Sequence, residues 1–227
     1  MRQDPDSITQ LGGWLFRHRT ALPLPFAAAI LGLRIGQAPP STGLVVTGVV
    51  VTLAGELLRL WGVHHIGAIS RTRADRLGPL VSSGPFGIVR NPLYLGNIAI
   101  WIGFALTARL VWLAPVILIL LGLEYHAIVR WEEQLLESRR GDEYRDYTSR
   151  VPRWFPRLSN RGDRGDRRGN QSHKEKKISA VSAVSAVNAG GQTNAGGQTW
   201  NATLFSERGT LLAIAAGYLL LYLKARF

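Results

Sequence analysis

Long apolar runs alternate with polar segments along this chain. Four of them cover residues 20–37, 43–61, 93–108 and 110–129, and a fifth covers residues 209–223. A helix rises about 1.5 Å per residue, so roughly 20 apolar residues cross a hydrocarbon layer of about 30 Å. The pattern therefore predicts an all-α fold: a polytopic membrane helical bundle with four core transmembrane helices and a possible fifth at the C-terminus.

The residues inside and between these runs indicate how the helices follow one another. Pro23, Pro25 and Arg34 interrupt the first run, which makes it the least regular of the four. Arg109 alone separates the third run from the fourth. A connection this short joins antiparallel neighbours, so we expect the third and fourth helices to form a tight hairpin.

A charged segment follows the fourth run and has an amphipathic pattern. Gly141 is expected to interrupt its helix, and Trp154, Phe155 and Pro156 form an aromatic end of the kind found at membrane interfaces. We interpret the segment as lying on the membrane surface. The alternative is a soluble amphipathic helix that packs against another domain. The residues on its expected apolar face are Leu135, Leu136, Tyr144, Tyr147 and Val151.

Composition changes abruptly after this segment and suggests three parts. We expect residues 1–158 to form the membrane core, together with the amphipathic segment. Residues 159–200 contain Ser-Ala-Val three times and Asn-Ala-Gly-Gly-Gln-Thr twice, so we predict a disordered low-complexity linker. Residues 201–227 hold the final apolar helix.

Charge and cysteine content narrow the functional classes. The net charge is +12. Because the chain also has long apolar runs, we interpret this charge as the positive-inside bias of a membrane protein. Nucleic-acid binding is disfavoured, since no recognition module is present. This bias predicts that Arg17, Arg19, the 62–92 loop and the segment after Arg130 face the cytoplasm. The chain has no cysteine, which excludes disulfides and thiolate metal sites.

Four polar residues fall at a similar depth in the predicted helices. Glu56, Asn97, Glu124 and His126 each lie about five residues from a cytoplasmic helix end, which is roughly 8 Å into the membrane. Ionisable groups at such depth usually face a cavity or a partner, so we expect a polar cavity that opens to the cytosol. The alternatives are an i,i+3 pair of Glu56 with Arg59, and snorkelling of Glu124 and His126 to the interface.

Two motifs flank the predicted hairpin. The first reads Arg90-Asn91-Pro92-Leu93-Tyr94-Leu95-Gly96, and the second begins with Glu132-Glu133 and continues through Gly141, Tyr144, Tyr147 and Arg153 to Pro156. In this order, and separated by a helical hairpin, they resemble the isoprenylcysteine carboxyl methyltransferases and the related phospholipid methyltransferases. Asn91 stands where that pattern usually has histidine.

The resemblance implies an integral membrane methyltransferase that uses S-adenosylmethionine on a lipophilic acceptor, either an isoprenoid carboxylate or a lipid-like amine. We expect it in the bacterial inner membrane, with its active site facing the cytoplasm. Arg90 is the candidate for orienting an acceptor carboxylate, and Glu124 or His126 would take the proton from an amine acceptor. The residues expected to hold the cofactor are Arg90, Asn91, Pro92, Tyr94, Asn97, Glu132 and Glu133.

Two pairs of adjacent residues, Glu132-Glu133 and His64-His65, can be interpreted from their spacing. Glu132 and Glu133 should point about 100° apart on a helix, so one is expected to face the cavity and the other an arginine such as Arg90 or Arg130. The pair His64-His65 has no carboxylate at ligand spacing nearby, so we predict no metal.

Two other functions are compatible with the sequence. One is a membrane reductase of the sterol-reductase type that uses NADPH, because the C-terminal half of such enzymes has a similar layout. The other is a non-catalytic membrane scaffold whose basic tail binds anionic lipid or a partner. Cofactor titration distinguishes all three, because the scaffold would bind neither cofactor.

The charge distribution generates a topology test. In an Asp75→Cys variant, the new thiol is the only one in the chain. We expect a membrane-impermeant maleimide to label it in inverted vesicles but not in intact cells, because the 62–92 loop is expected to face the cytoplasm. Labelling from the outside only would contradict the orientation.

Overall fold

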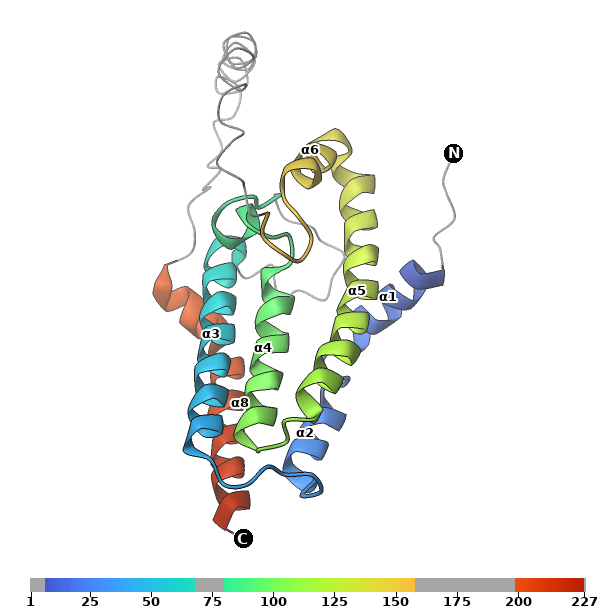
Figure 1. The fold of residues 1–227 in the computed structure, drawn as a ribbon. Helices are drawn as coiled ribbons and strands as arrows, with labels where there is room; N and C mark the ends of the chain where they lie inside the picture. The colour runs from blue at the N-terminus through green and yellow to red at the C-terminus, as the bar shows by residue number, and fades with distance from the viewer. Residues whose placement is uncertain (1–6, 68–79, 158–198, 227) are drawn as a thin grey trace.

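The fold was analysed in a computed structural model, which describes residues 7–67, 80–157 and 199–226. All regular structure in these residues is helical. Figure 1 shows a helical bundle in which α3 (Thr42–Ile66) and α5 (Leu113–Arg140) run opposite to α4 (Pro92–Thr107) and α8 (Trp200–Arg226). The all-α bundle predicted from the sequence is therefore confirmed.

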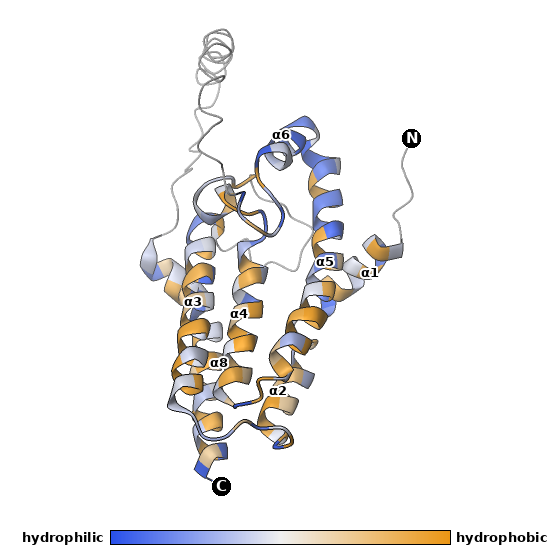
Figure 2. Ribbon diagram, in the orientation of Figure 1, coloured by the Kyte–Doolittle hydropathy of each residue, from blue (hydrophilic) through white to orange (hydrophobic). Residues whose placement is uncertain are grey.

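Three of these helices, α3, α5 and α8, are long and apolar enough to cross a membrane, and α4 is a shorter apolar helix. Their outer faces carry exposed apolar side chains, such as Val46, Val50, Leu53 and Leu57 on one face of α3. Figure 2 shows apolar residues along the bundle and polar ones at the end that carries α6 (Asp142–Arg150). An apolar outer surface of this kind suits a lipid bilayer.

The first predicted span is wrong. Residues 20–37 contain only α2 (Leu24–Gly32), whose nine residues are too few to cross a bilayer. Pro23 and Pro25 stand at its start, and Leu33 adopts an extended conformation that ends it. The short helix packs beside α4 and α8 instead.

The N-terminal segment, expected only to be polar, contains an amphipathic helix, α1 (Ser7–His18). Gly12 and Gly13 let it approach α5 closely: a Cβ at Gly12 would lie 2.7 Å from the Ala127 carbonyl carbon, and one at Gly13 3.0 Å from Trp131 Nε1. The rings of Phe16 and Trp131 are 4.8 Å apart. This helix therefore covers one side of α5 near the Glu132-Glu133 motif.

The fifth run is longer than predicted. Helix α8 has 27 residues and begins at Trp200, whereas the apolar run begins at residue 209. Its polar first turns pack at the end of α3, where the rings of Trp200 and His64 stack 4.1 Å apart. The predicted linker at 159–200 falls almost wholly outside the described residues.

The predicted hairpin is confirmed. Arg109 has a φ of 61°, in the left-handed region, and turns the chain tightly between α4 and α5. Its carbonyl accepts a hydrogen bond from Ala38 N at 2.9 Å, which holds the turn against the α2–α3 connection. As a result, the start of α4 and the second half of α5 lie at the same end of the bundle (Figure 1).

Helices α3 and α4 are held in backbone contact by paired glycines. A Cβ at Gly103 would lie 2.6 Å from the carbonyl oxygen of Gly48, and one at Gly55 would lie 2.7 Å from that of Gly96. Small residues at such interfaces let membrane helices approach closely enough for strong van der Waals contact. This seam fixes α4, and with it Arg90 and Tyr94, against α3.

The seam predicts a strong effect of a single methyl group. Gly103→Ala should destabilise the protein by roughly 1–3 kcal/mol, because the added Cβ meets backbone that cannot move aside. Gly122→Ala on α5 is the matched control, since its Cβ would meet nothing within 4 Å. Thermal unfolding in detergent should show a lower melting temperature for Gly103→Ala alone. Equal melting temperatures for the two variants would contradict the close contact.

Candidate functional site

The first motif lies where the loop after η2 (Gly84–Gly87) enters α4. Pro92 occupies the first turn of the helix, where its missing N–H costs nothing. Asn91 makes no side-chain cap for α4; its amide instead donates to the Arg153 carbonyl at 3.2 Å. Arg90 N donates to the Pro152 carbonyl at 2.9 Å. The segment after α6 is thus tied to the start of α4.

Glu133 of α5 joins the two motifs. Its carboxylate lies 3.0 Å from Arg90 Nη1, and it accepts two hydrogen bonds from Arg153, at 3.0 Å from Nε and 2.6 Å from Nη2. The Glu133 side chain is only 15% exposed. Charge-assisted, bidentate contacts of this kind are strong and directional, and their attraction offsets the loss of hydration. One carboxylate therefore orients two guanidinium groups from different parts of the chain.

Glu132 points to another side of α5, as the 100° step predicts. Its carboxylate accepts a hydrogen bond from the Tyr94 hydroxyl at 3.0 Å. The Tyr94 ring packs on Tyr125, with ring centroids 4.6 Å apart. The guanidinium of Arg19 is close enough to act electrostatically on Tyr94 and Glu132. The Glu pair thus fastens both ends of the Arg90–Tyr94 motif to α5.

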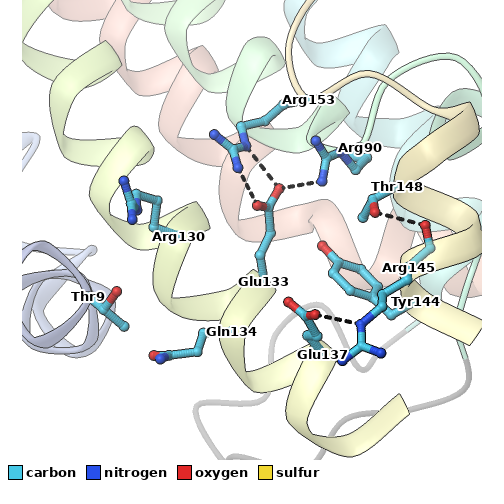
Figure 3. Close-up of a pocket in the computed structure, with 10 residues that line it drawn as sticks. All are labelled: Thr9, Arg90, Arg130, Glu133, Gln134, Glu137, Tyr144, Arg145, Thr148 and Arg153. Carbon is cyan, nitrogen blue, oxygen red and sulfur yellow. Dashed lines mark hydrogen bonds and ion pairs between the residues drawn. The ribbon is translucent and has the colours of Figure 1, made fainter. Parts of the chain in front are cut away.

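A cavity of about 630 Å³ opens beside Glu133. Figure 3 shows Glu133 between Arg90 and Arg153 on its wall, with Thr9 of α1 on the far side of Arg130. Charges of both signs converge there, so the cavity suits a polar ligand that itself carries both signs. Its lining residues are Thr9, Arg90, Arg130, Glu133, Gln134, Glu137, Tyr144, Arg145, Thr148 and Arg153.

Helix α6 lines one side of the cavity. Gly141, with a φ of 52°, ends α5 and turns the chain back, as the sequence predicted. Tyr147 then donates to the Phe86 carbonyl at 2.8 Å, and Tyr144 lines the cavity together with Arg90. Burial raises the pKa of Tyr147 to about 12, and burial together with the charge of Glu133 raises the pKa of Tyr144 further. Both phenols are therefore neutral at physiological pH.

None of the four residues expected at one depth lines the cavity at Glu133. Glu56 pairs with Arg59 at 3.4 Å, which confirms the i,i+3 alternative, and Asn97 accepts a hydrogen bond from the same Arg59. Neither Glu124 nor His126 lines the cavity at Glu133. Their catalytic roles stay predictions.

Position along α5 explains why Glu124 and His126 lie apart from the cavity. Glu124 precedes Glu133 by nine residues and so points to the opposite side of α5, whereas His126 lies roughly two turns away on the same side.

Within the described part of the chain, no group of three histidines, aspartates or glutamates could hold a metal ion.

Sequence reasoning missed several residues of this region. Arg153 was noticed as part of the second motif but not as a partner of Glu133, because the contact spans 20 residues across the α5–α6 turn. Thr9 lies on a helix that the apolar pattern does not reveal. Arg59 was considered only as a partner of Glu56, although an arginine in a long apolar run signals a buried partner.

Comparison with known proteins bears on what this site does. The sequence model of the family described as phospholipid methyltransferase matches residues 44–142, which include both Arg90 and the Glu pair. No solved structure matches the chain.

Two curated relatives are similar over longer or comparable stretches. The nickel-cobalt-cadmium resistance protein NccN of Alcaligenes xylosoxydans xylosoxydans is 30% identical over 155 residues, which cover 66% of this chain and 70% of that protein. The cobalt-zinc-cadmium resistance protein CzcN of Cupriavidus metallidurans is 32% identical over 101 residues, 44% of each chain.

Proposed function

The chain belongs to the phospholipid methyltransferase family, and we propose that it is an integral membrane methyltransferase that uses S-adenosylmethionine on a lipophilic acceptor. The observation that carries the proposal is Glu133, which holds Arg90 and Arg153 beside a cavity of about 630 Å³ at one end of an apolar bundle. This arrangement supports a polar ligand site next to a lipid-facing surface.

The residues at the cavity fit S-adenosylmethionine. The volume lies within the roughly 300–1,000 Å³ typical of small-molecule pockets. Arg90 and Arg153 both line the cavity and are the candidates to bind a ligand carboxylate; Arg90 Nε has no hydrogen-bond partner among the described residues. Glu133 and Glu137 supply negative charge for the ammonium and sulfonium groups. When bound, the cofactor supplies an electrophilic methyl group.

The chain's own residues would act mainly by positioning. Orientation of two reactants can supply on the order of 7–11 kcal/mol of a barrier. Arg90 and Arg153 are held rigidly enough to orient a carboxylate, and a carboxylate acceptor needs no general base. An amine acceptor must lose a proton, and Glu124, whose Oε1 is buried without a hydrogen-bond partner among the described residues, is the candidate to take it.

The acceptor would reach the site from the lipid, and the cofactor from the cytosol. The cavity is lined in part by Tyr144, Arg145 and Thr148 of α6, and Figure 2 shows this end of the bundle as polar and the long helices below it as apolar. Basic residues gather at this end, so the positive-inside bias favours a cytoplasmic orientation in the bacterial inner membrane.

Calorimetry with S-adenosylmethionine tests the site. Arg90→Ala should weaken binding about 10- to 100-fold, because a hydrogen bond to a charged group is worth about 1.5–3 kcal/mol. Arg90→Lys should rescue it poorly, since lysine lacks the planar fork of donors. Glu133→Gln should do similar damage by releasing both arginines, and Asn91→His should be tolerated.

Arg150→Ala is the matched control, because Arg150 pairs with Asp146 on the exposed side of α6 and does not line the cavity. Wild-type affinity in both Arg90→Ala and Glu133→Gln would place the cofactor elsewhere. Binding of NADPH in place of S-adenosylmethionine would favour the reductase, and binding of neither would favour the scaffold.

The names of the two relatives suggest a second, physiological proposal: that the activity contributes to tolerance of heavy metals. The similarity to NccN extends over 155 residues and thus beyond the family match. Cells that depend on this chain should grow at higher cobalt, nickel or cadmium concentrations with the wild type than with Arg90→Ala. Equal growth, with both proteins present in the membrane, would show that the activity does not contribute to metal tolerance.

A further inference from the structure

A second polar cluster lies inside the bundle, below the cavity, and centres on Arg59 of α3. Its guanidinium donates to Asn97 of α4 and, through Nη2, to Glu207 of α8 at 2.7 Å and Thr210 of α8 at 3.3 Å. Glu56 lies 3.4 Å from Arg59 Nε. Three helices that are far apart in sequence therefore meet at one side chain.

The charged groups of this cluster are buried, which costs free energy of hydration. Glu207 is only 1% exposed, and the Arg59 side chain 14%. Charged groups within membrane helices are expensive, and where they occur they usually serve a functional site and have a specific partner. The contact between α3 and α4 does not need them, because these two helices already pack through glycines.

The cluster is connected to the site by a chain of contacts. The side chain of Asn97 interacts with that of Tyr125 of α5, whose ring packs against Tyr94 at 4.6 Å. Tyr94 in turn donates to Glu132 at 3.0 Å. Asn97 and Tyr94 lie three residues apart on α4 and so share a face of that helix. Arg59 is thus linked through Asn97 to the Tyr94–Glu132 contact.

We infer that Glu207 is a positioning residue for methyl transfer: it fixes Arg59, which holds Asn97 and, through Tyr125, the Tyr94–Glu132 pair. Helix α8 follows the residues 44–142 that match the family, so a helix outside the family match completes the site. The inference rests on the proposed function, because the reaction is the one that the positioned groups would serve.

Kinetics of variants in the full chain test this role. Glu207→Leu removes the carboxylate but leaves Arg59 paired with Glu56, so the bundle should still fold. We expect kcat to fall about 100-fold, as small misplacements far from the chemistry can do, with little change in KM or in S-adenosylmethionine affinity. Glu207→Gln should lose less, because its amide oxygen still accepts from Arg59.

Arg208→Gln is the matched control, because Arg208 is the exposed neighbour of Glu207 and stacks on Phe205. It should keep the wild-type kcat. A folded Glu207→Leu protein with wild-type kcat would overturn the inference, as would an equal loss in Arg208→Gln.

A second measurement needs no activity. Melting temperatures of Glu207→Leu, Asn97→Leu and the double variant form a cycle around Arg59. If the cluster is one unit, the double variant should lose less than the sum of the single losses. Additive losses would overturn the connection. A wild type that transfers no methyl group would instead overturn the proposed function, and this cycle would still decide whether Glu207 and Asn97 are linked.

Discussion

The ion pairs of Glu133 with Arg90 and Arg153 are the interaction on which the site depends. They bring together the start of α4, the C-terminal part of α5 and the segment after α6, and each of these would otherwise expose or bury an unpaired charge. Removing one partner of a buried pair typically costs about 3–5 kcal/mol, because the other charge remains without water. The same geometry that makes the contact stable also keeps two guanidinium groups turned toward the cavity.

Two features of the helices make this contact possible. The tight turn at Arg109 returns the chain so that α4 and α5 present their polar ends on one side, and Gly141 lets α6 fold back over them. Tyr147 of α6 then donates a hydrogen bond to the carbonyl of Phe86, which ties α6 to the segment before α4. Each feature acts through backbone geometry, and the chemistry of the site follows from it.

Much of this arrangement could be predicted from local signals. Apolar runs located α3, α4 and α5, and the single residue between the last two indicated that Arg90 and the Glu pair would meet. The remainder depends on contacts between distant segments. Helix α1 is polar on one side and becomes recognisable only when Gly12 and Gly13 meet α5. Helix α8 starts nine residues before its apolar run because His64 and Arg59 provide partners for its polar turns. Arg153 reaches Glu133 only after the chain reverses at Gly141.

The glycine seam between α3 and α4 has a consequence for how the molecule can move. Backbone-to-backbone contact leaves no path for an acyl or prenyl chain between these helices, so together they behave as one stiff double rod. An opening toward the lipid between α4 and α5 would require displacement of α5, with α1 and α6 attached, against that rod. Such a displacement stretches the bonds of Glu133 to Arg90 and of Glu132 to Tyr94. This interface can therefore either admit a bulky molecule or hold the polar site together, but it cannot do both at once.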